Sequence, residues 1–258
     1  MARVRLDSLL AERGLFSSRA RAAASVAAGE VLVSGVRASR PAQLVAPDAA
    51  VSVAEAERFV SRGGRKLVNA LDAFGVDVAG RLALDVGAST GGFTDVLLRR
   101  GASCVVAVDV ADGELDPGLR SDPRVVPLRL NARSLDRSVL PFAPDLVVVD
   151  VSFISATKVL PAVLACAAPR FDALVLVKPQ FEVGRSRVGK NGVVRSAVAR
   201  RDALLAVARS WDGSVLGFAS SGLPGPKGNR ETFVWLAEPG RAGAVVDLEA
   251  AARGVEPS

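Results

Sequence analysis

The sequence predicts a protein of the α/β class, with a parallel sheet in its main domain and a small α+β domain before it. From about residue 63 to residue 240, short apolar runs alternate with amphipathic segments, as in parallel strands that are buried on both faces and joined by helices. Before residue 58 the pattern changes to two short helical segments followed by a strand. With 258 residues, half of them hydrophobic, the chain has room for one ordinary domain and a small second one.

The N-terminal segment carries many positive charges. We expect helices over residues 5–13 and 18–28, ended by Gly14 and Gly29, and then a strand over 31–36 that enters a turn. The first forty residues hold seven arginines: Arg3, Arg5, Arg13, Arg19, Arg21, Arg37 and Arg40. A basic face of this kind suits RNA, although a solvated helical hairpin without a partner would show the same pattern.

The main domain should begin with a helix that runs from about residue 61 to residue 74. The elements expected after it are strand 82–86, helix 93–100, strands 104–109, 124–128 and 145–150, helix 155–167, strand 172–177, helix 196–209, and strands 213–219 and 231–237. We expect the last two strands to form an antiparallel hairpin at the edge of the sheet. The chain is therefore divided into a domain 1–58, a linker 59–62, a main domain 63–240 and a peripheral tail 241–258.

The turn after strand 82–86 is the most informative segment. Asp85 lies near the end of the strand, and the turn over residues 87–92 follows the pattern Asp-x-Gly-x-x-x-Gly-Gly. Glycines let the backbone approach a flat, extended ligand where a Cβ would clash. Since this is not the Gly-x-Gly-x-x-Gly of dinucleotide binders, it favours S-adenosylmethionine, which has no pyrophosphate. Asp109, at the end of the next strand, is placed to meet a ribose diol. The alternative is an ordinary loop whose glycines serve packing.

Charged residues stand at the ends of several predicted strands. Asp150 and Lys178 each follow an apolar strand, Glu231 opens the last strand, and Lys66 lies at the start of the first helix of the main domain. A charge in such a place costs desolvation free energy unless it has a partner or a task. Two lysines and two acids would balance one another at the carboxyl edge of the sheet. Two unrelated salt bridges are the alternative reading.

Several motifs in one order resemble a known family. The four charged residues resemble the Lys-Asp-Lys-Glu tetrad of the FtsJ-like ribose 2′-O-methyltransferases, and the first domain looks like an S4-type RNA-binding domain. From residue 3 to about 238 the chain resembles the TlyA family, in which the two are fused. The motifs are Ser-Arg-Gly-Gly-Arg-Lys-Leu at 61–67, Asp-Val-Gly-Ala-Ser-Thr-Gly-Gly-Phe-Thr-Asp at 85–95, Asp-Val-Ser-Phe-Ile-Ser at 150–155, Lys-Pro-Gln-Phe-Glu at 178–182 and Gly-Asn-Arg-Glu at 228–231.

The resemblance implies a Rossmann-like class I methyltransferase that uses S-adenosylmethionine to methylate cytidine 2′-hydroxyls of ribosomal RNA. The cofactor residues would be Asp85, Gly87, Ala88, Ser89, Thr90, Gly91, Gly92, Phe93, Asp109, Asn131 and Asp150. Asn131 is assigned an adenine contact by resemblance, and it could equally cap a turn. The RNA-binding residues would be Arg3, Arg5, Arg13, Arg19, Arg21, Arg37 and Arg65. Some family members have been labelled haemolysins, but no segment here is built to insert in a bilayer.

The residue types suggest a mechanism. A ribose 2′-hydroxyl is a weak acid, so a nearby base helps as the methyl group moves. We hypothesise that Lys178 is that base, that Lys66 makes its proton labile, that Asp150 orients it, and that Glu231 holds Lys66. Arginine could not serve, because it does not lose its proton in proteins. Phe153 could stack on the target base, but a phenylalanine is more often part of the core.

Composition sets the remaining limits. The chain has no histidine and no tyrosine, which excludes histidine-based acid–base chemistry and histidine metal sites, and we expect no metal. The net charge of +6 favours a polyanionic partner, here ribosomal RNA or a ribosomal subunit. Cys104 and Cys166 are expected to be buried thiols of a cytoplasmic, monomeric protein without a membrane segment. The alternatives are a non-catalytic RNA-binding assembly factor and, less well supported by the glycine spacing, a nicotinamide-dependent oxidoreductase.

Overall fold

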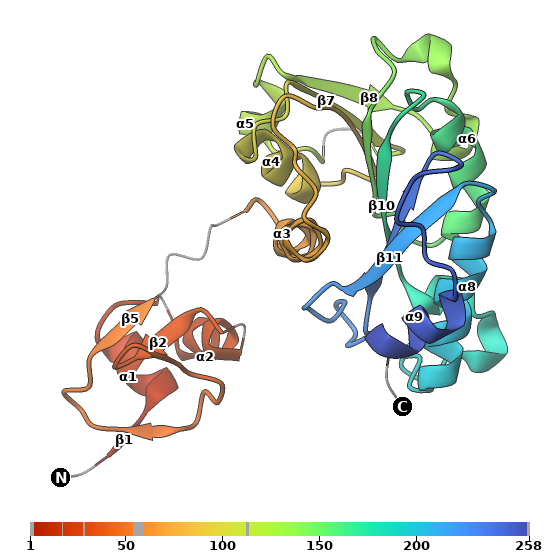
Figure 1. Ribbon diagram of the computed structural model, residues 1–258. Coiled ribbons are helices and arrows are strands. Elements are labelled where there is room, and N and C mark those ends of the chain that lie inside the picture. The colour runs from red at the N-terminus through yellow and green to blue at the C-terminus, as the bar shows by residue number, and fades with distance from the viewer. Residues whose placement is uncertain (1–2, 17, 28, 54–58, 112–113, 257–258) are drawn as a thin grey trace. The chain divides into compact units, whose positions relative to one another are not determined.

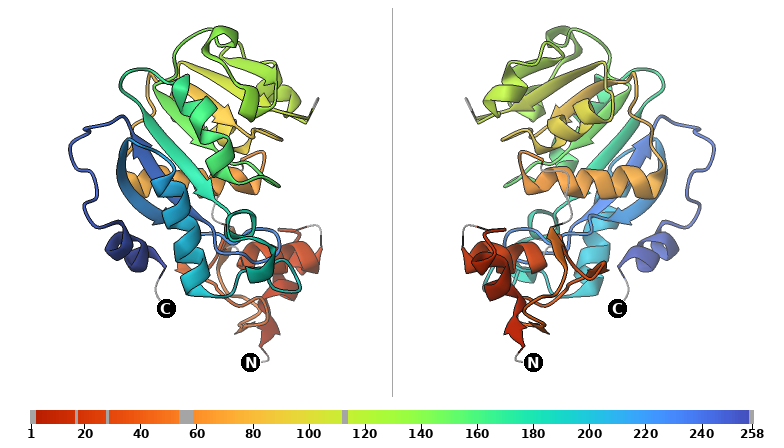
Figure 2. Two further views of the ribbon diagram at one scale, coloured as in Figure 1. Left: turned by 90° about the vertical axis from the view of Figure 1, so that its right-hand side faces the viewer. Right: turned by 90° about the vertical axis from the view of Figure 1, so that its left-hand side faces the viewer.

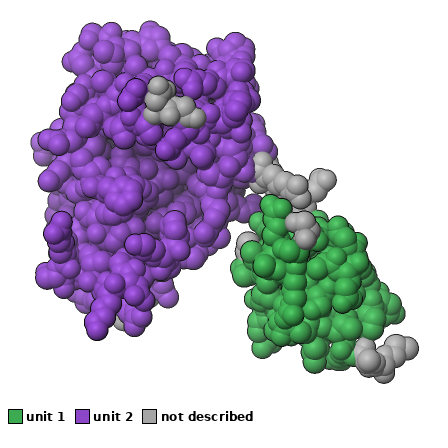
Figure 3. Space-filling view, turned by 180° about the vertical axis from the view of Figure 1, so that it is seen from behind, with its two compact units in different colours: residues 1–58 green, residues 59–258 purple. Residues whose placement is uncertain are grey.

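The computed structural model describes the chain except for residues 1–2, 17, 28, 54–58, 112–113 and 257–258. The chain divides into two compact units, residues 1–58 and residues 59–258, which are coloured separately in Figure 3.

The first unit is a small α+β domain. Its elements are β1 (Val4–Arg5), α1 (Leu6–Glu12), α2 (Arg19–Ala27), β2 (Val31–Val33), β3 (Val36–Arg37), β4 (Leu44–Val45) and β5 (Val51–Val53). β1 pairs with β4, and β2 lies between β3 and β5 in a three-stranded antiparallel sheet. The two helices fall where the sequence predicts them. The expected strand over 31–36 is a hairpin of β2 and β3, because Ser34 and Gly35 both take positive φ in its turn.

A few leucines and valines make the core of this unit. Leu6 and Leu10 of α1, Val26 of α2 and Val31 of β2 are all fully buried in one cluster, in which α1 packs on α2. At the start of α1 the carboxylate of Asp7 is also buried, and it accepts hydrogen bonds from the Arg5 guanidinium at 3.0 and 2.8 Å. The bonds from Arg5 lower the pKa of Asp7, so this carboxylate stays ionised although it is buried.

The second unit is built on a seven-stranded sheet. The strands are β6 (Leu82–Val86), β7 (Cys104–Asp109), β8 (Val125–Arg129), β9 (Leu146–Val149), β10 (Asp172–Val177), β11 (Ser214–Ser220) and β12 (Thr232–Ala237). Their order across the sheet is β11-β12-β10-β9-β6-β7-β8. The five strands from β10 to β8 are parallel, whereas β12 and β11 are antiparallel. This confirms the predicted α/β class and the antiparallel hairpin at one edge.

Helices cover both faces of this sheet (Figure 1). The longer ones are α3 (Arg62–Phe74), α4 (Gly92–Arg99), α6 (Leu160–Ala165), α8 (Ala197–Arg209) and α9 (Leu248–Val255), and α5 (Pro117–Arg120) and α7 (Pro179–Glu182) are single turns. α3 and α4 pack on one face with alternate strand residues such as Leu146 and Val148. α6 and α8 pack on the other face with Val147 and Val149. Each view of Figure 2 shows one of these two helical layers in front of the sheet.

Two segments of this unit differ from, or add to, what the sequence pattern predicts. The expected helix over 155–167 is a 3-10 turn at Ala156–Lys158 followed by the short α6, because Pro161, which has no N–H to donate, stands in the first turn of a new helix. Near the end of the chain α9 packs against α8 and β11. There Glu256 accepts a hydrogen bond from Arg200 Nε at 2.8 Å, and both side chains are buried.

Candidate active site

The site lies where the order of the parallel strands reverses direction. From β6 the chain moves outward to β7 and β8, then returns to β9 on the other side of β6. Open α/β sheets bind their ligands at such a switch point, beyond the carboxyl ends of the strands. Gly87 follows β6, Asp150 follows β9 and Lys178 follows β10, so all three stand at this edge.

Gly87 fits this position only as glycine. Its φ is 88°, and a Cβ added to it would lie 2.7 Å from the backbone oxygen of Asp150. Its N–H donates to Val108 O at 2.8 Å, which ties the turn to the neighbouring strand β7. The backbone of β9 therefore passes directly against the glycine turn, and any side chain at residue 87 would push the two apart.

The start of α3 is held against the start of α4. Ser61 caps α3 by accepting a hydrogen bond from Gly63 N at 3.2 Å, and its Oγ fills the space where a Cβ of Gly92 would stand. The Phe59 side chain likewise fills the space where a Cβ of Gly64 would stand. The Arg99 guanidinium lies over the Phe59 ring, 5.0 Å from the centre of that ring. These contacts set the direction of the start of α3, and Lys66 is the fifth residue of this helix.

A cavity of about 760 Å³ opens at this edge, within the usual range for a small-molecule site. All four members of the expected tetrad line it: Lys66, Asp150, Lys178 and Glu231. The glycine turn contributes Gly87, Ala88, Ser89, Thr90, Gly92 and Phe93. Asp85, Gly91, Asp109, Asn131 and Arg65, which the sequence also suggests as site residues, do not line it.

The four charged side chains form two ion pairs. Lys178 Nζ lies 2.6 Å from Asp150 Oδ1 and donates a hydrogen bond to Ser152 Oγ at 2.7 Å. Lys66 Nζ donates to Glu231 Oε2 in a second pair whose side chains are only 8% and 1% exposed. Each ammonium therefore has its own carboxylate, and the four charges sum to zero. The Lys178 pair is the more accessible one, at 11% and 21% exposure.

Asp85 lies behind the turn rather than in the cavity. It is fully buried, and Thr94 Oγ1 of α4 donates a hydrogen bond to its Oδ2 at 2.7 Å. No described residue donates a hydrogen bond to its Oδ1. Burial raises the pKa of Asp85 to about 7, with a smaller contribution from the nearby charge of Asp150. Asp85 is thus a carboxyl group that can be neutral near physiological pH.

Asp109 and Asn131 have local hydrogen bonds. Asp109, the last residue of β7, accepts hydrogen bonds from the backbone N–H groups of Ser89 at 2.9 Å and Ala111 at 3.0 Å. Its carboxylate therefore holds the glycine turn to the end of β7. Asn131 is exposed and caps a 3-10 turn by accepting from Arg133 N at 3.1 Å. The sequence allowed two interpretations of Asn131, an adenine contact or the cap of a turn, and the structure shows that it caps a turn.

Phe153 is not part of the core, so the interpretation favoured for it from sequence is wrong. Its side chain lies on the rim of the cavity, the residue is 93% exposed, and its φ of 65° is in the region that favours glycine. The ring lies 5.4 Å from that of Phe181, centre to centre, at an angle of 49°. An exposed ring that rests on the half-buried Phe181 at the rim of the cavity offers a face on which a flat ring could stack.

The arginines of the first unit fall into two groups. Arg5 and Arg19 contact the buried Asp7, the latter at 3.2 Å, and Arg13 donates to backbone oxygens of the loop that precedes β5. These three therefore support the fold as well as contributing positive charge. Arg3 and Arg37 are exposed. In the second unit Arg65 is half-buried on α3.

Sequence reasoning missed several residues of the cavity. Ser152 receives the Lys178 hydrogen bond, Gln180 lines the wall with a buried side-chain oxygen that no described group donates to, and Asn229 lines it beside Glu231. Each stands inside a motif that carries the family resemblance, two residues or fewer from a tetrad member. Closeness in sequence to a tetrad member could have suggested these residues, but sequence alone does not show whether a side chain points into the cavity.

Comparison with known proteins places the chain in a family. A family model described as FtsJ-like methyltransferase matches residues 59–238, and one for the S4 domain matches residues 4–51. The fold and the site thus define a methyltransferase joined to an S4 domain.

Within that class the chain belongs to the TlyA family. It is 51% identical over 242 residues to the 16S/23S rRNA (cytidine-2'-O)-methyltransferase TlyA of Mycobacterium tuberculosis, covering 91% of this chain and 90% of that protein. A protein named Hemolysin A from Brachyspira hyodysenteriae is 38% identical, over 78% of this chain and 85% of its own. A solved structure from Streptococcus thermophilus that carries a hemolysin name superimposes with a TM-score of 0.72 at 35% identity, covering 98% and 96%.

The described part of the chain holds neither a membrane-spanning helix nor a candidate metal cluster. None of the helices in the described part of the chain has the length and apolar character needed to cross a membrane. Nor do three or more His, Cys, Asp or Glu side chains gather there in a group that could hold a metal ion.

Proposed function

We propose that this protein transfers a methyl group from S-adenosylmethionine to the 2′-hydroxyl of cytidine in ribosomal RNA, of the small subunit, the large subunit or both. The observation that carries the proposal is the meeting of two lysine–carboxylate pairs and a glycine turn around one cavity. The printed function of the Mycobacterium tuberculosis relative supports the substrate. A substrate of this kind is found in the cytoplasm.

The residues present suit the proposed cofactor. Gly87 lines the cavity, and because Asp150 O lies against it only glycine lets the turn follow this course. The turn over residues 87–92 offers backbone rather than bulky side chains to a ligand. Asp109 accepts a hydrogen bond from Ser89 N of this turn at 2.9 Å, and as the acid at the end of β7 it would be the residue that meets a ribose diol. S-adenosylmethionine, when bound, supplies a methyl group on a positively charged sulfur.

Lys178 is proposed as the group that takes up the hydroxyl proton. Its Nζ is held between Asp150 Oδ1 and Ser152 Oγ, which fixes its position at the mouth of the cavity. A lysine in this role must first give up its own proton to solvent, which reaches the partly exposed Lys178–Asp150 pair. Asp150 orients the amine and stabilises the ammonium that forms when Lys178 takes up the hydroxyl proton. Lys66, held by Glu231, places a second ammonium group in the same cavity. Alignment of the hydroxyl with the methyl group would supply much of the remaining acceleration.

RNA recognition is proposed to involve the S4 domain arginines and, in the second unit, Arg65. Base positioning is assigned to Phe153, whose exposed ring on the rim can stack on a nucleobase turned out of its helix. Such an exposed ring has no role in the core of the protein, so a binding role is the simpler account of its position.

The test is transfer of labelled methyl from S-adenosylmethionine to purified ribosomal RNA, followed by digestion to locate the 2′-O-methylated nucleoside. Lys178→Arg keeps the positive charge, but an arginine does not release its proton and so cannot act as the base. We therefore expect the rate of methyl transfer to fall at least about 100-fold while S-adenosylmethionine binding is retained. Lys158→Arg is the matched control, since Lys158 is exposed and does not line the cavity. Activity retained in Lys178→Arg would refute the base assignment. RNA binding without any methyl transfer by the wild type would favour the assembly factor instead.

A further inference from the structure

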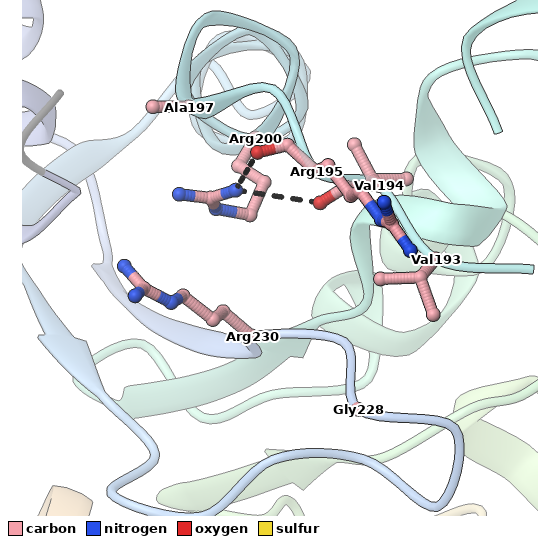
Figure 4. A pocket seen from close by; sticks show the side chains of 7 residues that line it. All are labelled: Val193, Val194, Arg195, Ala197, Arg200, Gly228 and Arg230. Carbon is pink, nitrogen blue, oxygen red and sulfur yellow. Dashed lines mark hydrogen bonds between the residues drawn. The ribbon is translucent and has the colours of Figure 1, made fainter. Parts of the chain in front are cut away.

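A second cavity, of about 400 Å³, lies in the methyltransferase unit (Figure 4). The segment before α8, the first turns of α8 and the loop before β12 form its walls. Its lining residues are Val193, Val194, Arg195, Ala197, Arg200, Gly228 and Arg230. We refer to it as the arginine cavity, because three of its seven residues are arginines and none is acidic.

Arg200 is the fixed member of this group. It is 7% exposed, and its Nε donates to Glu256 Oε2 at 2.8 Å. Its Nη1 donates to the backbone oxygens of Arg195 at 2.7 Å and Val194 at 3.3 Å. Within the described residues no acceptor is recorded for its Nη2. The guanidinium is therefore locked in place with part of its donor capacity still unused.

Arg195 and Arg230 are free to bind a ligand. Both are exposed, and neither side chain makes an ion pair or hydrogen bond with any described residue. In Figure 4 the guanidinium groups of Arg200 and Arg230 extend from opposite walls toward the same side of the cavity. Three guanidinium groups against the single carboxylate of Glu256 leave a net charge of about +2 at this concave site.

The beginning of α8 adds to the positive potential. Ala197 is the first residue of this 13-residue helix and lines the cavity. Ser196 caps the helix by accepting from Ala199 N at 3.2 Å, and the remaining N–H groups of the first turn keep the positive end of the helix dipole at the cavity. The fixed guanidinium of Arg200, the unpaired one of Arg230 and the helix N-terminus form a site for an oxyanion with several acceptor oxygens, which is the chemistry of a phosphate group. The Arg195 side chain extends to the other side, beside Val193 and Val194, and adds positive charge to the wall of the cavity.

The arginine cavity adjoins the proposed active site. Asn229 binds the intervening loop with both ends of its amide, donating to Gly192 O at 2.7 Å and accepting from Val194 N at 2.9 Å. Gly192 and Asn229 line the large cavity, whereas Val194 and Arg230 line the arginine cavity. Arg230 immediately precedes Glu231 of the tetrad. A strand whose ribose reaches Lys178 would therefore have backbone phosphates close by.

We propose that the arginine cavity binds a phosphate of the RNA backbone next to the nucleotide that is methylated. The inference rests on the proposed function for the identity of the polymer. The cavity holds the strand without reading its sequence, because phosphate contacts fix the register of a nucleic acid and carry no base information. It would act together with the S4 domain, whose contacts lie on a different unit of the chain.

The test compares Arg230→Ala, Arg195→Ala and wild-type full-length protein for binding to transcripts of ribosomal RNA over a range of KCl concentrations. Each substitution is expected to weaken binding about tenfold and to lower the slope of log affinity against log salt by roughly 0.7 to 0.9, the amount for one phosphate contact. Binding of S-adenosylmethionine and the melting temperature should not change. Arg170→Ala is the matched control, because Arg170 is exposed and lies before β10, at the amino ends of the parallel strands, whereas the loop before β12 lies at their carboxyl ends. If Arg230→Ala and Arg195→Ala bind RNA like Arg170→Ala, the proposal is wrong.

A second measurement identifies the source of the phosphate. Inorganic phosphate is titrated into wild-type protein and Arg230→Ala by calorimetry, and an RNA backbone site should show only weak, millimolar binding. Micromolar binding that is lost in Arg230→Ala, with RNA affinity unchanged, would overturn the RNA assignment in favour of a free phosphate-bearing ligand. Because these experiments measure binding and not methyl transfer, an inactive wild type would refute the proposed function alone. Loss of RNA affinity in Arg230→Ala would still support the phosphate contact.

Discussion

The buried pair of Lys66 and Glu231 allows a quantitative prediction about the stability of the methyltransferase unit. Glu231→Gln keeps the size of the side chain and removes its charge. The Lys66 ammonium, whose side chain is 8% exposed, is then left without the only carboxylate recorded beside it in the described part of the chain. Removal of one partner of a buried ion pair costs about 3–5 kcal/mol, because the other charge stays desolvated and uncompensated. For a unit of this size, that corresponds to a fall in melting temperature of about 6–20 °C.

The assay is urea or thermal unfolding followed by tryptophan fluorescence. Both tryptophans of the chain, Trp211 and Trp235, lie in the unit 59–258, so the signal reports this unit. Glu249→Gln is the matched control, because Glu249 pairs with Arg209 at 2.9 Å on the surface with both side chains 56% exposed, and its loss should cost less than about 1 kcal/mol. The double variant Lys66→Gln/Glu231→Gln should be more stable than Glu231→Gln alone, since no unpaired charge remains.

Equal stability of Glu231→Gln and Glu249→Gln would refute this reasoning. It would mean that Lys66 finds another partner or reaches solvent, and that the pair does not hold the first turn of α3 against the loop before β12. A double variant less stable than Glu231→Gln would contradict the argument in a different way, because it would show that the Lys66 charge is not the source of the cost.

Two further predictions concern Gly87, which lines the cavity, and Asp85, which lies behind the glycine turn. Gly87→Ala should abolish measurable S-adenosylmethionine binding and destabilise the unit by at least about 1–2 kcal/mol, because φ is 88° and the new Cβ would lie 2.7 Å from Asp150 O; binding by calorimetry that matches wild type would contradict this. Burial raises the pKa of Asp85 from its ordinary value of 3.8 to about 7, so this carboxyl group lowers the free energy of unfolding progressively as pH rises from about 4 to 7. Asp85→Asn should therefore be more stable than wild type by up to about 4 kcal/mol at pH 8, with a smaller difference at pH 5, as measured by urea unfolding. A difference that does not grow with pH would show that the carboxyl is not perturbed.

Much of the fold follows from local patterns in the chain. The bounds expected for β6, β7 and β10 agree with the structure to the residue, because each is an apolar run with polar or turn-forming residues at its ends. The short strands β4 and β5 were not predicted. Each is only two or three residues long, and pairing with β1 and β2 rather than a local pattern makes them strands.

The candidate site was also predictable in part from local patterns in the chain. Lys66, Asp150, Lys178 and Glu231 could be selected from sequence, because charges at the ends of apolar strands must find partners and parallel strands end at one edge. The exposure of Phe153 was not predictable, since it depends on a left-handed turn after β9 that carries the ring out of the core.

The amino-acid sequence by itself determined the two units, the parallel sheet, the glycine turn and the family. Each of these depends on the type and spacing of residues that are close together in the sequence. Only the tertiary structure decided which carboxylate pairs with which lysine, and that Arg195, Arg200 and Arg230 share one cavity. These relations join residues from different elements. Their distances depend on how the whole sheet and its helices pack, which no local pattern encodes.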